Sequence, residues 1–447
     1  MRLMTKYLLS FFVATVFLAA CKKNEDHVFN QTPDERINQA LQNYQSQLSG
    51  AQYGWKAVLY PKGGGAYFFY LKFNDANRVQ MVSDFDSASA VNVKESSYRL
   101  KALQQPSLIF DTYSYIHVLS DPDASVNGGT FGQGLLSDFE FYFNDSTSTS
   151  ADTLKLTGRV NGSRFVLTKA TQEEASGYTG GLFNINLFKD NLAQILQYFK
   201  RLTIGTNTYD ININPVTKTV IFTWTDGQGN VLTLTTTFYF TLNGIALEKP
   251  LMDGSNAIWE LTNLSWSSST NTINLTAGSS AATITGVVKP LVVDVDAPHR
   301  WWQYALNAGQ YWISVDGFHV NGVDDAFGIK TLATDTSTYY YLAYWPRPVS
   351  GQTYDVMFPA YLITSQGALD IIYGMAQTPT FLTDGRVVFK YLGDLTVGPY
   401  PTTGPAASTK TQLLIPQGYY FVQTTATSYD MVSAADAKSW ITWYYIF

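Results

Sequence analysis

Short stretches in which apolar and polar residues alternate recur along almost the whole chain of 447 residues. Ser137–Phe143 is the clearest example, because Phe139, Phe141 and Phe143 fall at every second position. A period of two is typical of strands that bury one face, and turns such as Gly63–Gly65, rather than helices, separate the stretches. The pattern predicts a mainly β fold of tandem antiparallel β meanders, in barrel- or sandwich-like units, with a few short helices.

Helical patterns appear at three places along the chain. The first begins after Thr32, a good N-cap residue, has Pro33 in its first turn and continues to Leu48. Apolar residues at three- and four-residue spacing predict a second helix over 184–202, and a short third helix is expected over 298–306.

These helices divide the predicted strands into three blocks. The second block repeats the order of patterns of the first and is interpreted as a diverged copy, although half-buried strands give similar patterns without any duplication. Within the blocks, 113–119 is expected to be a strand and 398–408 a loop. The expected domains are a helix plus β domain at 33–170, a second helix plus β domain at 171–295, and an aromatic-rich β domain at 296–447.

The first twenty residues have the pattern of a signal peptide. Basic residues are followed by an apolar run that is too short to span a bilayer. The run ends in Leu18-Ala19-Ala20-Cys21, which resembles the bacterial lipobox, and Cys21 is the only cysteine of the chain. We expect residues 1–20 to be a lipoprotein signal peptide, Cys21 to carry the lipid, and 21–32 to be a tether. The alternative is an ordinary signal peptide with a chance cysteine.

The tether suggests where the anchored protein faces. Acidic residues follow Lys22-Lys23 and resemble the surface-export signal of Bacteroidota lipoproteins. We therefore expect an outer-membrane protein, held by its N-terminal lipid on the cell surface. A solvated linker that leaves the protein in the periplasm is the alternative.

Composition and motifs exclude several classes of function. A net charge of −6 with only 14% charged residues argues against nucleic-acid binding. A single cysteine excludes a disulfide framework and a cysteine-based zinc site. The common catalytic motifs of metalloproteases, serine hydrolases and nucleotide-binding enzymes do not occur. We therefore expect a non-enzymatic protein with no catalytic residues and no cofactor.

Two groups of histidine and aspartate residues could in principle supply metal ligands. We interpret both as turn aspartates with structural histidines and predict no metal site, because neither group has a diagnostic ligand spacing. One group is His117, Asp121 and Asp123; the other is Asp294, Asp296, His299, Asp316, His319, Asp324 and Asp325.

Aromatic residues make up 15% of the chain and are densest in its last third. Neighbouring strand residues point to opposite faces, so the run from Tyr339 to Trp345 cannot enter a single core. Trp301, Trp302, Tyr344 and Trp345 are the candidate ligand-binding residues, because flat rings can stack on sugar rings. The alternative is a strand buried on both faces or a seam between domains.

Three segments resemble a known family: Leu108–Tyr113, His117–Pro122 and Ser137–Phe141. They are similar to the Bacteroidota lipoproteins grouped as domain of unknown function 4302. The resemblance implies genes close to SusC/SusD-type outer-membrane uptake systems and carries over no functional residue. We expect a surface-anchored lipoprotein that assists nutrient capture, with a glycan as the expected ligand. The alternatives are a hydrolase with a carboxylate or metal site in the C-terminal third, and a purely structural subunit of the transporter complex.

Overall fold

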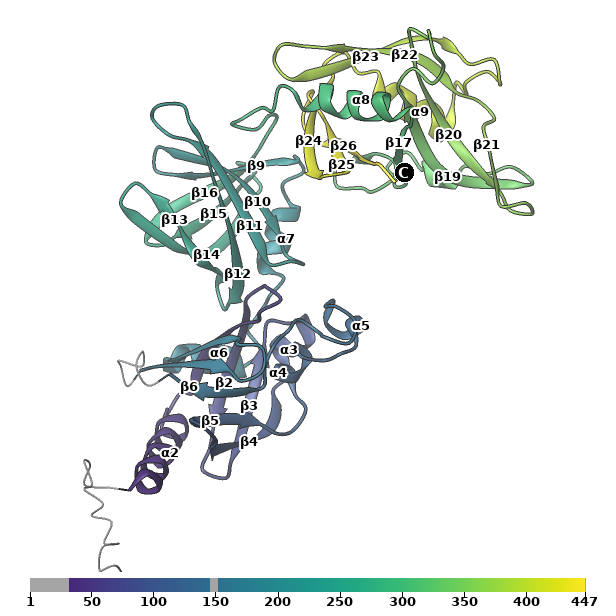
Figure 1. The fold of residues 1–447 in the computed structure, drawn as a ribbon. Helices are drawn as coiled ribbons and strands as arrows, with labels where there is room; N and C mark the ends of the chain where they lie inside the picture. Colours follow the sequence, from purple (N-terminus) through teal and green to yellow (C-terminus); the bar gives the residue numbers. More distant parts are fainter. Residues whose placement is uncertain (1–31, 145–151, 447) are drawn as a thin grey trace, which may run out of the picture.

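The computed structural model describes residues 32–144 and 152–446 and contains three β units that follow one another along the chain (Figure 1). Strands dominate, the helices are short, and every strand pairing between named elements is antiparallel within the described residues. The predicted mainly β, antiparallel fold is therefore confirmed. The predicted signal peptide, Cys21 and nearly all of the tether lie outside the described residues. None of the described helices is both long and apolar enough to cross a membrane.

The first unit is a closed barrel preceded by a helix. The helix α2 spans Pro33–Ser49, as predicted, and Thr32 caps its first turn by exchanging hydrogen bonds with Glu35. The barrel closes because β1 pairs with β8 along their full lengths. Its strands are β1 Trp55–Tyr60, β2 Tyr67–Phe73, β3 Arg78–Ser83, β4 Lys94–Ala102, β5 Pro106–Phe110, β6 Glu140–Phe143, β7 Thr153–Gly158 and β8 Arg164–Lys169. Short helices lie in its connections: α3 Ser87–Val91, α4 Tyr115–Val118 and α5 Ala124–Asn127.

Alternate residues of these strands fill the interior of the first barrel. Trp55, Leu71 and Phe141 are among its fully buried side chains. The apolar stripe of α2 packs against the barrel, where Tyr44 stacks on Phe143 with 3.7 Å between ring centroids. The period-two pattern of the sequence thus becomes a packed core.

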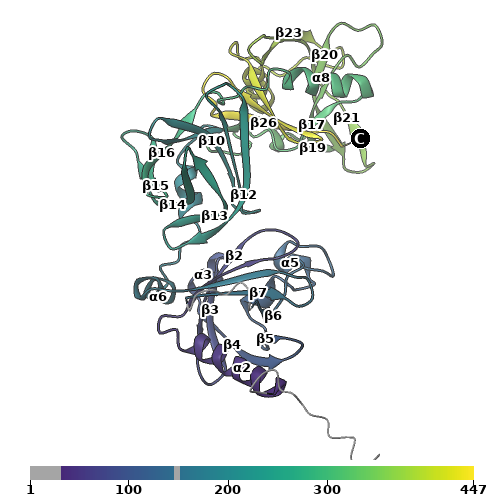
Figure 2. The same ribbon diagram turned by 60° about the vertical axis from the view of Figure 1, so that its left-hand side comes forward.

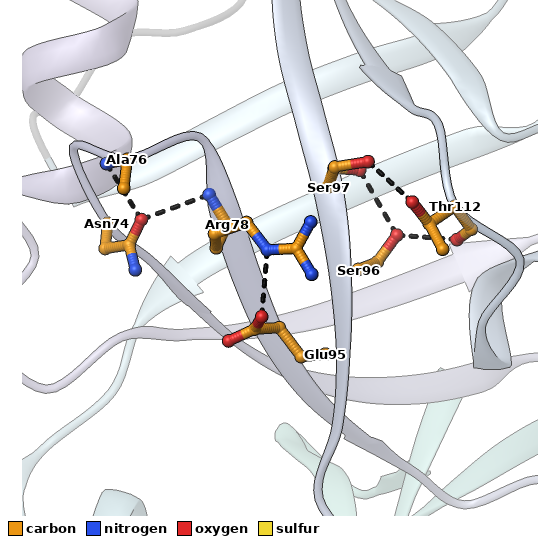
Figure 3. A network of polar contacts seen from close by, with 7 residues as sticks. All are labelled: Asn74, Ala76, Arg78, Glu95, Ser96, Ser97 and Thr112. Carbon is orange, nitrogen blue, oxygen red and sulfur yellow. Dashed lines mark hydrogen bonds and ion pairs between the residues drawn. The ribbon is translucent and has the colours of Figure 1, made fainter.

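Short polar side chains fix the connections of this barrel (Figure 3). Asn74 Oδ1 accepts a hydrogen bond from the backbone N–H of Arg78 at 3.0 Å, which closes the turn between β2 and β3. The Arg78 side chain in turn donates to Glu95 on β4 at 2.8 Å. On the other side of β4, Ser96 Oγ donates to the carbonyl of Thr112 at 2.6 Å. These contacts set the local path of the chain.

The second unit is also a closed barrel of eight strands. Two helices lead into it, α6 Gln172–Thr179 and α7 Leu187–Ala193. The strand order is sequential, and β9 closes the barrel by pairing with β16. The strands are β9 Phe199–Ile204, β10 Asn207–Asn214, β11 Thr219–Thr225, β12 Val231–Thr241, β13 Gly244–Asp253, β14 Asn256–Ser267, β15 Thr272–Ala277 and β16 Ser280–Val287.

The predicted helix over 184–202 is wrong in its second half. The helix α7 ends at Ala193, and the chain enters β9 at Phe199. Phe199–Ile204 pairs with β10 on one side and with β16 on the other. This pairing closes the barrel, so distant partners override the local helical spacing.

The third unit is a strongly curved sheet whose ends meet. A single pair, Ile313 with Tyr444, joins β17 to β26 and completes a circuit of strands around the core. The strands are β17 Trp312–Ser314, β18 His319–Val320, β19 Ser337–Trp345, β20 Asp355–Ile363, β21 Ala368–Asp370, β22 Met375–Phe381, β23 Arg386–Asp394, β24 Tyr419–Thr425, β25 Ser428–Ser433 and β26 Ser439–Tyr444.

Helices cover the third unit. The predicted short helix over 298–306 is confirmed as α8, Ala297–Ala308, and a 3₁₀ turn, η1, covers Ile329–Thr331. The predicted loop over 398–408 is wrong from Gly404 onward, because α9 spans Gly404–Leu413. Pro405 lies in its first turn, a position in which proline favours a helix, and α9 buries Ala406 and Leu413.

Candidate functional site: the groove between the first two barrels

The first two barrels share one continuous apolar cluster. Phe68 and Tyr70 on the outside of the first barrel pack with Tyr178 of α6 and with Phe183 in the following connection. The same cluster continues into the interior of the second barrel. Figures 1 and 2 show the two barrels end to end, with α6 beside their junction. This packing fixes the position of the facing surfaces of the two barrels relative to each other.

A buried ion pair crosses this junction. Asp84 directly follows β3 of the first barrel, and Lys218 directly precedes β11 of the second. Lys218 Nζ lies 2.7 Å from Asp84 Oδ1, and the two residues are 5% and 0% exposed, respectively. Burial raises the pKa of Asp84 and lowers that of Lys218, while their attraction opposes both shifts.

Beside this ion pair lies a groove of about 500 Å³, within the range of small-molecule sites. One wall is the outer face of β8, β1 and β2; the other is the β12–β13 connection with parts of β12, β13 and β14; and α6 flanks both. The lining residues are Lys56, Val58, Tyr60, Phe68, Arg164, Val166, Thr168, Glu174, Tyr178, Tyr239, Thr241, Leu242, Asn243, Ala246, Glu260, Thr262 and Asn263.

Aromatic rings from both walls meet in the groove. Phe68 of the first barrel and Tyr239 of the second are nearly parallel, with 6.2 Å between their centroids. Phe68 also stacks on Tyr178 at 4.8 Å. Burial raises the pKa of Tyr60 and Tyr239 above the usual tyrosine value, so both hydroxyls remain protonated at neutral pH. The rings therefore combine apolar faces with neutral hydroxyl groups.

Charged side chains also line the groove, beside its aromatic rings. Lys56 Nζ lies 2.5 Å from Glu174 Oε1, and both residues line the groove. The guanidinium of Arg164 covers the Tyr60 ring at 3.5 Å and also pairs with Glu248 of the second barrel at 2.8 Å. The groove thus contains paired charges of both signs rather than a field of one sign.

One hydroxyl group of the groove has no partner. Thr241 Oγ1 is buried and makes no hydrogen bond within the described part of the chain. A buried polar atom without a partner is costly, but this oxygen is closed off from solvent, so a molecule in the groove reaches it only if the wall shifts. The amides of Asn243 and Asn263 give the groove hydrogen-bonding groups for a hydroxyl-rich molecule.

Three of the four predicted ligand-binding residues lie in the core of the third unit. Trp301 and Tyr344 are 0% exposed and Trp302 is 6% exposed. Trp302 Nε1 and the Tyr344 hydroxyl both donate to Asp355 Oδ2, at 2.7 and 2.6 Å. Their faces are covered by protein, so they form a structural core and not an open stacking platform.

Trp345, the fourth predicted residue, lies on the opposite face of β19. It is half-buried and packs on Tyr311 with 5.3 Å between centroids. This outer face carries a second apolar cluster around Ile313 and Phe358. The structure therefore does not bring Trp345 together with the three core rings, and β19 is buried on both faces.

The smaller histidine group has a structural role. His117 lies in α4, so the predicted strand over 113–119 is wrong; Ser114 begins a helical turn there instead. His117 Nδ1 accepts a hydrogen bond from the Ser114 backbone N–H at 3.2 Å, and burial lowers the pKa of His117. The Tyr113 hydroxyl donates to Asp121, and Asp123 caps α5.

The larger group is divided among separate local contacts. His319 pairs with Asp324 at 2.6 Å, and Asp294 pairs with Arg300. Asp325 accepts hydrogen bonds from the backbone of the η1 turn. Across the residues that the structure describes, no three histidine, cysteine or acidic side chains gather in a way that could hold a metal ion.

Sequence reasoning missed the groove entirely. Its first wall comes from outward-facing positions of β1 and β8, such as Lys56 and Arg164, which alternate with core residues and are typical of a solvated strand face. Its second wall comes from residues 239–263, far away in sequence. The only local signal is that Tyr60 and Tyr239 are aromatic residues at outward positions of their strands, and that Tyr239 is flanked by threonines at positions 237 and 241 of the same face.

Comparison with known families gives a match over more than half of the chain. Residues 25–266 match the family described as "Domain of unknown function (DUF4302)", and the chain belongs to this family. The matched segment contains the whole first barrel and the second as far as β14, and therefore both walls of the groove. The expected membership of domain of unknown function 4302 is thus confirmed, and the assignment to Bacteroidota lipoproteins stays a prediction. No curated protein matches the chain.

Solved structures give only distant similarities. A protein of unknown function from the DUF3598 family of Nostoc punctiforme aligns over 73% of this chain and 96% of its own, with 10% identity and a TM-score of 0.14. The Helicobacter pylori beta clamp, solved with a DNA ligase peptide, aligns over 91% and 97%, with 8% identity and a TM-score of 0.13. At these TM-scores neither similarity carries an argument.

Proposed function

We propose that this protein is a Bacteroidota lipoprotein, anchored through Cys21 on the cell surface, that captures a glycan without cleaving it, beside a SusC/SusD-type uptake system. The observation that carries the proposal is the groove of about 500 Å³ between the first two barrels. Its walls belong to two barrels joined by a buried ion pair and a shared apolar cluster. Such a groove exists before the ligand arrives, which lowers the cost of binding.

The chemistry of the lining supports a sugar. Arg164 covers one face of the Tyr60 ring and Phe68 lies against one side of Tyr239, so each ring offers its other face and its hydroxyl group. Asn243 and Asn263 add neutral hydrogen-bonding groups. Pyranose rings have an apolar face and a rim of hydroxyls, so they use both kinds of group. Stacking on one ring contributes roughly 1–3 kcal/mol, by analogy with bases stacked on aromatic side chains. Two such contacts give a modest affinity, suited to a protein that passes its ligand on.

Capture is favoured over hydrolysis because of the state of the carboxylates. A glycosidase needs two carboxyl groups facing each other across the bond to be cleaved, one of them held protonated. Of the two acidic residues that line the groove, Glu174 is engaged by Lys56 at 2.5 Å. Glu260, on β14, lines the opposite wall and is exposed.

The position of α2 supports the anchoring. The helix lies at the end of the first barrel that is remote from the second barrel, as both ribbon views show. A lipid on Cys21, twelve positions before Pro33, would attach the protein at this end and leave the groove and the third unit farther from the membrane. The lipobox-like run Leu18-Ala19-Ala20-Cys21 supplies the site of acylation.

Binding is tested by affinity electrophoresis in gels that contain soluble starch, arabinoxylan, pectin or mucin glycans. We expect one polysaccharide to retard the protein, and the Tyr60→Ala/Tyr239→Ala variant to lose at least tenfold in affinity. Tyr340→Ala removes an exposed tyrosine outside the groove and serves as the matched control. Cys21→Ala should in parallel release the protein from the outer-membrane fraction.

Each part of the proposal has its own contrary outcome. Release of reducing sugars from the retarding polysaccharide would support the hydrolase alternative. Failure of every glycan to retard the protein, together with co-purification of a SusC/SusD-type complex, would support a purely structural subunit. Unchanged membrane attachment of Cys21→Ala would contradict the lipid anchor.

A further inference from the structure

One carboxylate ties the backbones of both groove walls together. Asp84 Oδ1 accepts a hydrogen bond from the backbone N–H of Phe68 at 2.8 Å, in the first barrel. Its Oδ2 accepts one from the backbone N–H of Phe240 at 2.9 Å, in the second barrel. Phe68 itself lines the groove, and Phe240 directly follows Tyr239 of the opposite wall. The position of Asp84 therefore determines how far apart the two walls lie.

The partner lysine crosses from the second barrel into the first. Lys218 Nζ reaches Asp84 at 2.7 Å, lies 4.3 Å from the centroid of the Tyr67 ring, and donates to the carbonyl of Ala66 at 3.4 Å. The backbone of Lys218 has a φ of +50°, in the left-handed region that residues other than glycine and asparagine seldom adopt. The conformation directs the side chain across the junction at a cost to the local backbone.

A second ion pair between strands of the two barrels is of a different kind. Arg164 and Glu248 lie 2.8 Å apart, but their side chains are 53% and 31% exposed. Exposed pairs of this kind contribute little and tolerate many geometries, whereas a buried pair demands one geometry. The orientation of the first barrel relative to the second therefore depends on the buried pair of Asp84 and Lys218, and little on the exposed pair.

We propose that Asp84 and Lys218 are positioning residues that hold the first two barrels in one orientation and so set the width of the groove. Replacing a buried ion pair by apolar groups often preserves stability, so stability and orientation are separable here. The orientation itself is independent of any ligand; only its use in capture rests on the proposed function.

The test measures the distance between the barrels without a ligand. Spin labels are placed at Lys101→Cys on the first barrel and Gly227→Cys on the second, in the full mature chain with Cys21→Ser. We expect one narrow distance distribution for this parent protein. Lys218→Met leaves Asp84 charged and unpaired, so it should lower the thermal midpoint by more than 5 °C and at least double the width of the distribution.

A double variant separates orientation from stability. Asp84→Asn/Lys218→Met removes both charges but leaves one of the two backbone N–H groups without its acceptor, so it should recover part of the thermal midpoint while the distribution stays broad. If Lys218→Met does not fold, the distance distribution of the double variant alone tests the proposal. Glu248→Gln breaks the exposed pair and is the matched control, with both readouts unchanged. A narrow distribution in the double variant would overturn the proposal, whatever the outcome of the glycan experiments.

Discussion

The two junctions between neighbouring units are built from different interactions. Between the first and second barrels, a buried carboxylate and ammonium lie within an apolar cluster that runs from one unit into the other. Between the second barrel and the third unit, the contact is a smaller cluster of aromatic and aliphatic residues around Phe199 and Tyr420. Tyr198 adds hydrogen bonds to Asp430 and to the Ala437 carbonyl, both at 2.7 Å.

The difference concerns how far the units depend on each other. Removing the second barrel would leave Asp84 without its cation and would expose Phe68, whereas removing the third unit would uncover a few rings. The apolar cluster that crosses the first junction is larger than the one at the second, so separating the first two barrels exposes more apolar surface to water. The first two barrels should therefore behave as one folding unit, and the third unit as a separable domain.

The largest expected effect comes from cutting the chain at each junction. A fragment of residues 33–291 should melt cooperatively, with a midpoint within about 3 °C of the corresponding transition in the full chain. A fragment of residues 33–170 should show no cooperative transition, because Asp84 and Phe68 lose the surfaces that bury them. Circular dichroism melting distinguishes the two. Cooperative melting of the shorter fragment would show that the junctions do not differ in this way.

A smaller effect is expected from Trp440→Ala at the second junction. The half-buried Trp440 ring stacks on His319 at 3.7 Å and meets the Tyr198 ring at 5.4 Å. We expect a loss of about 2 kcal/mol in the third unit, below the 3–5 kcal/mol of a fully buried tryptophan. Denaturant unfolding should show this loss while the transition of the first two barrels stays in place. Trp259→Ala, at a residue that is 53% exposed, is the matched control. A shift of both transitions would show that this junction also couples folding.

The smallest effect is a pH dependence at the same junction. Burial lowers the pKa of Lys200, the neighbour of Phe199, to about 8. Between about pH 8 and the ordinary lysine value, the unfolded chain binds a proton that the folded chain does not, so stability rises with pH. From pH 8 to 9.5 we expect a gain of about 1 kcal/mol, reduced from the ideal slope because the side chain is partly solvated. Lys200→Met should lack this gain, and Lys390→Met, at an exposed lysine, should keep it. Parallel pH profiles for all three proteins would contradict the assignment.

The sequence was sufficient for elements that depend on local pattern. The capped helix after Thr32, the strand 339–345 and the helix over 298–306 follow from residues that are neighbours in the chain. The argument that 339–345 cannot enter one core also agrees with the structure, because Tyr344 points into the core and Tyr341 into the outer cluster. The structure buries Trp301, Trp302 and Tyr344 and so leaves them no open ring face, whereas the half-buried Trp345 stays a prediction.

Features that depend on distant partners could not be predicted. The segment 199–204 has helical spacing but becomes β9, because β10 and β16 supply its pairing. The groove lies between β1 and β8 of the first barrel and the β12–β14 hairpins of the second, and no local sequence pattern indicates that these surfaces face each other. Lys218 is the sharpest case, since a lysine beside a strand is ordinarily solvated. Only the three-dimensional structure shows that Lys218 pairs with the carboxylate of Asp84. The two residues are 218 − 84 = 134 positions apart in the sequence.

The closure of the third unit has a consequence for the order of folding events during synthesis. The contact that completes its circuit of strands joins Ile313 to Tyr444, so it needs β26, the last strand described. A chain that is synthesised from its N-terminus can complete the first two barrels before this strand has been made. The third unit then remains open, with its aromatic interior accessible, until β26 arrives. Chaperone binding to this late intermediate would therefore fall on the C-terminal third, and chains truncated before β26 would keep the exposed aromatic surface that proteases detect.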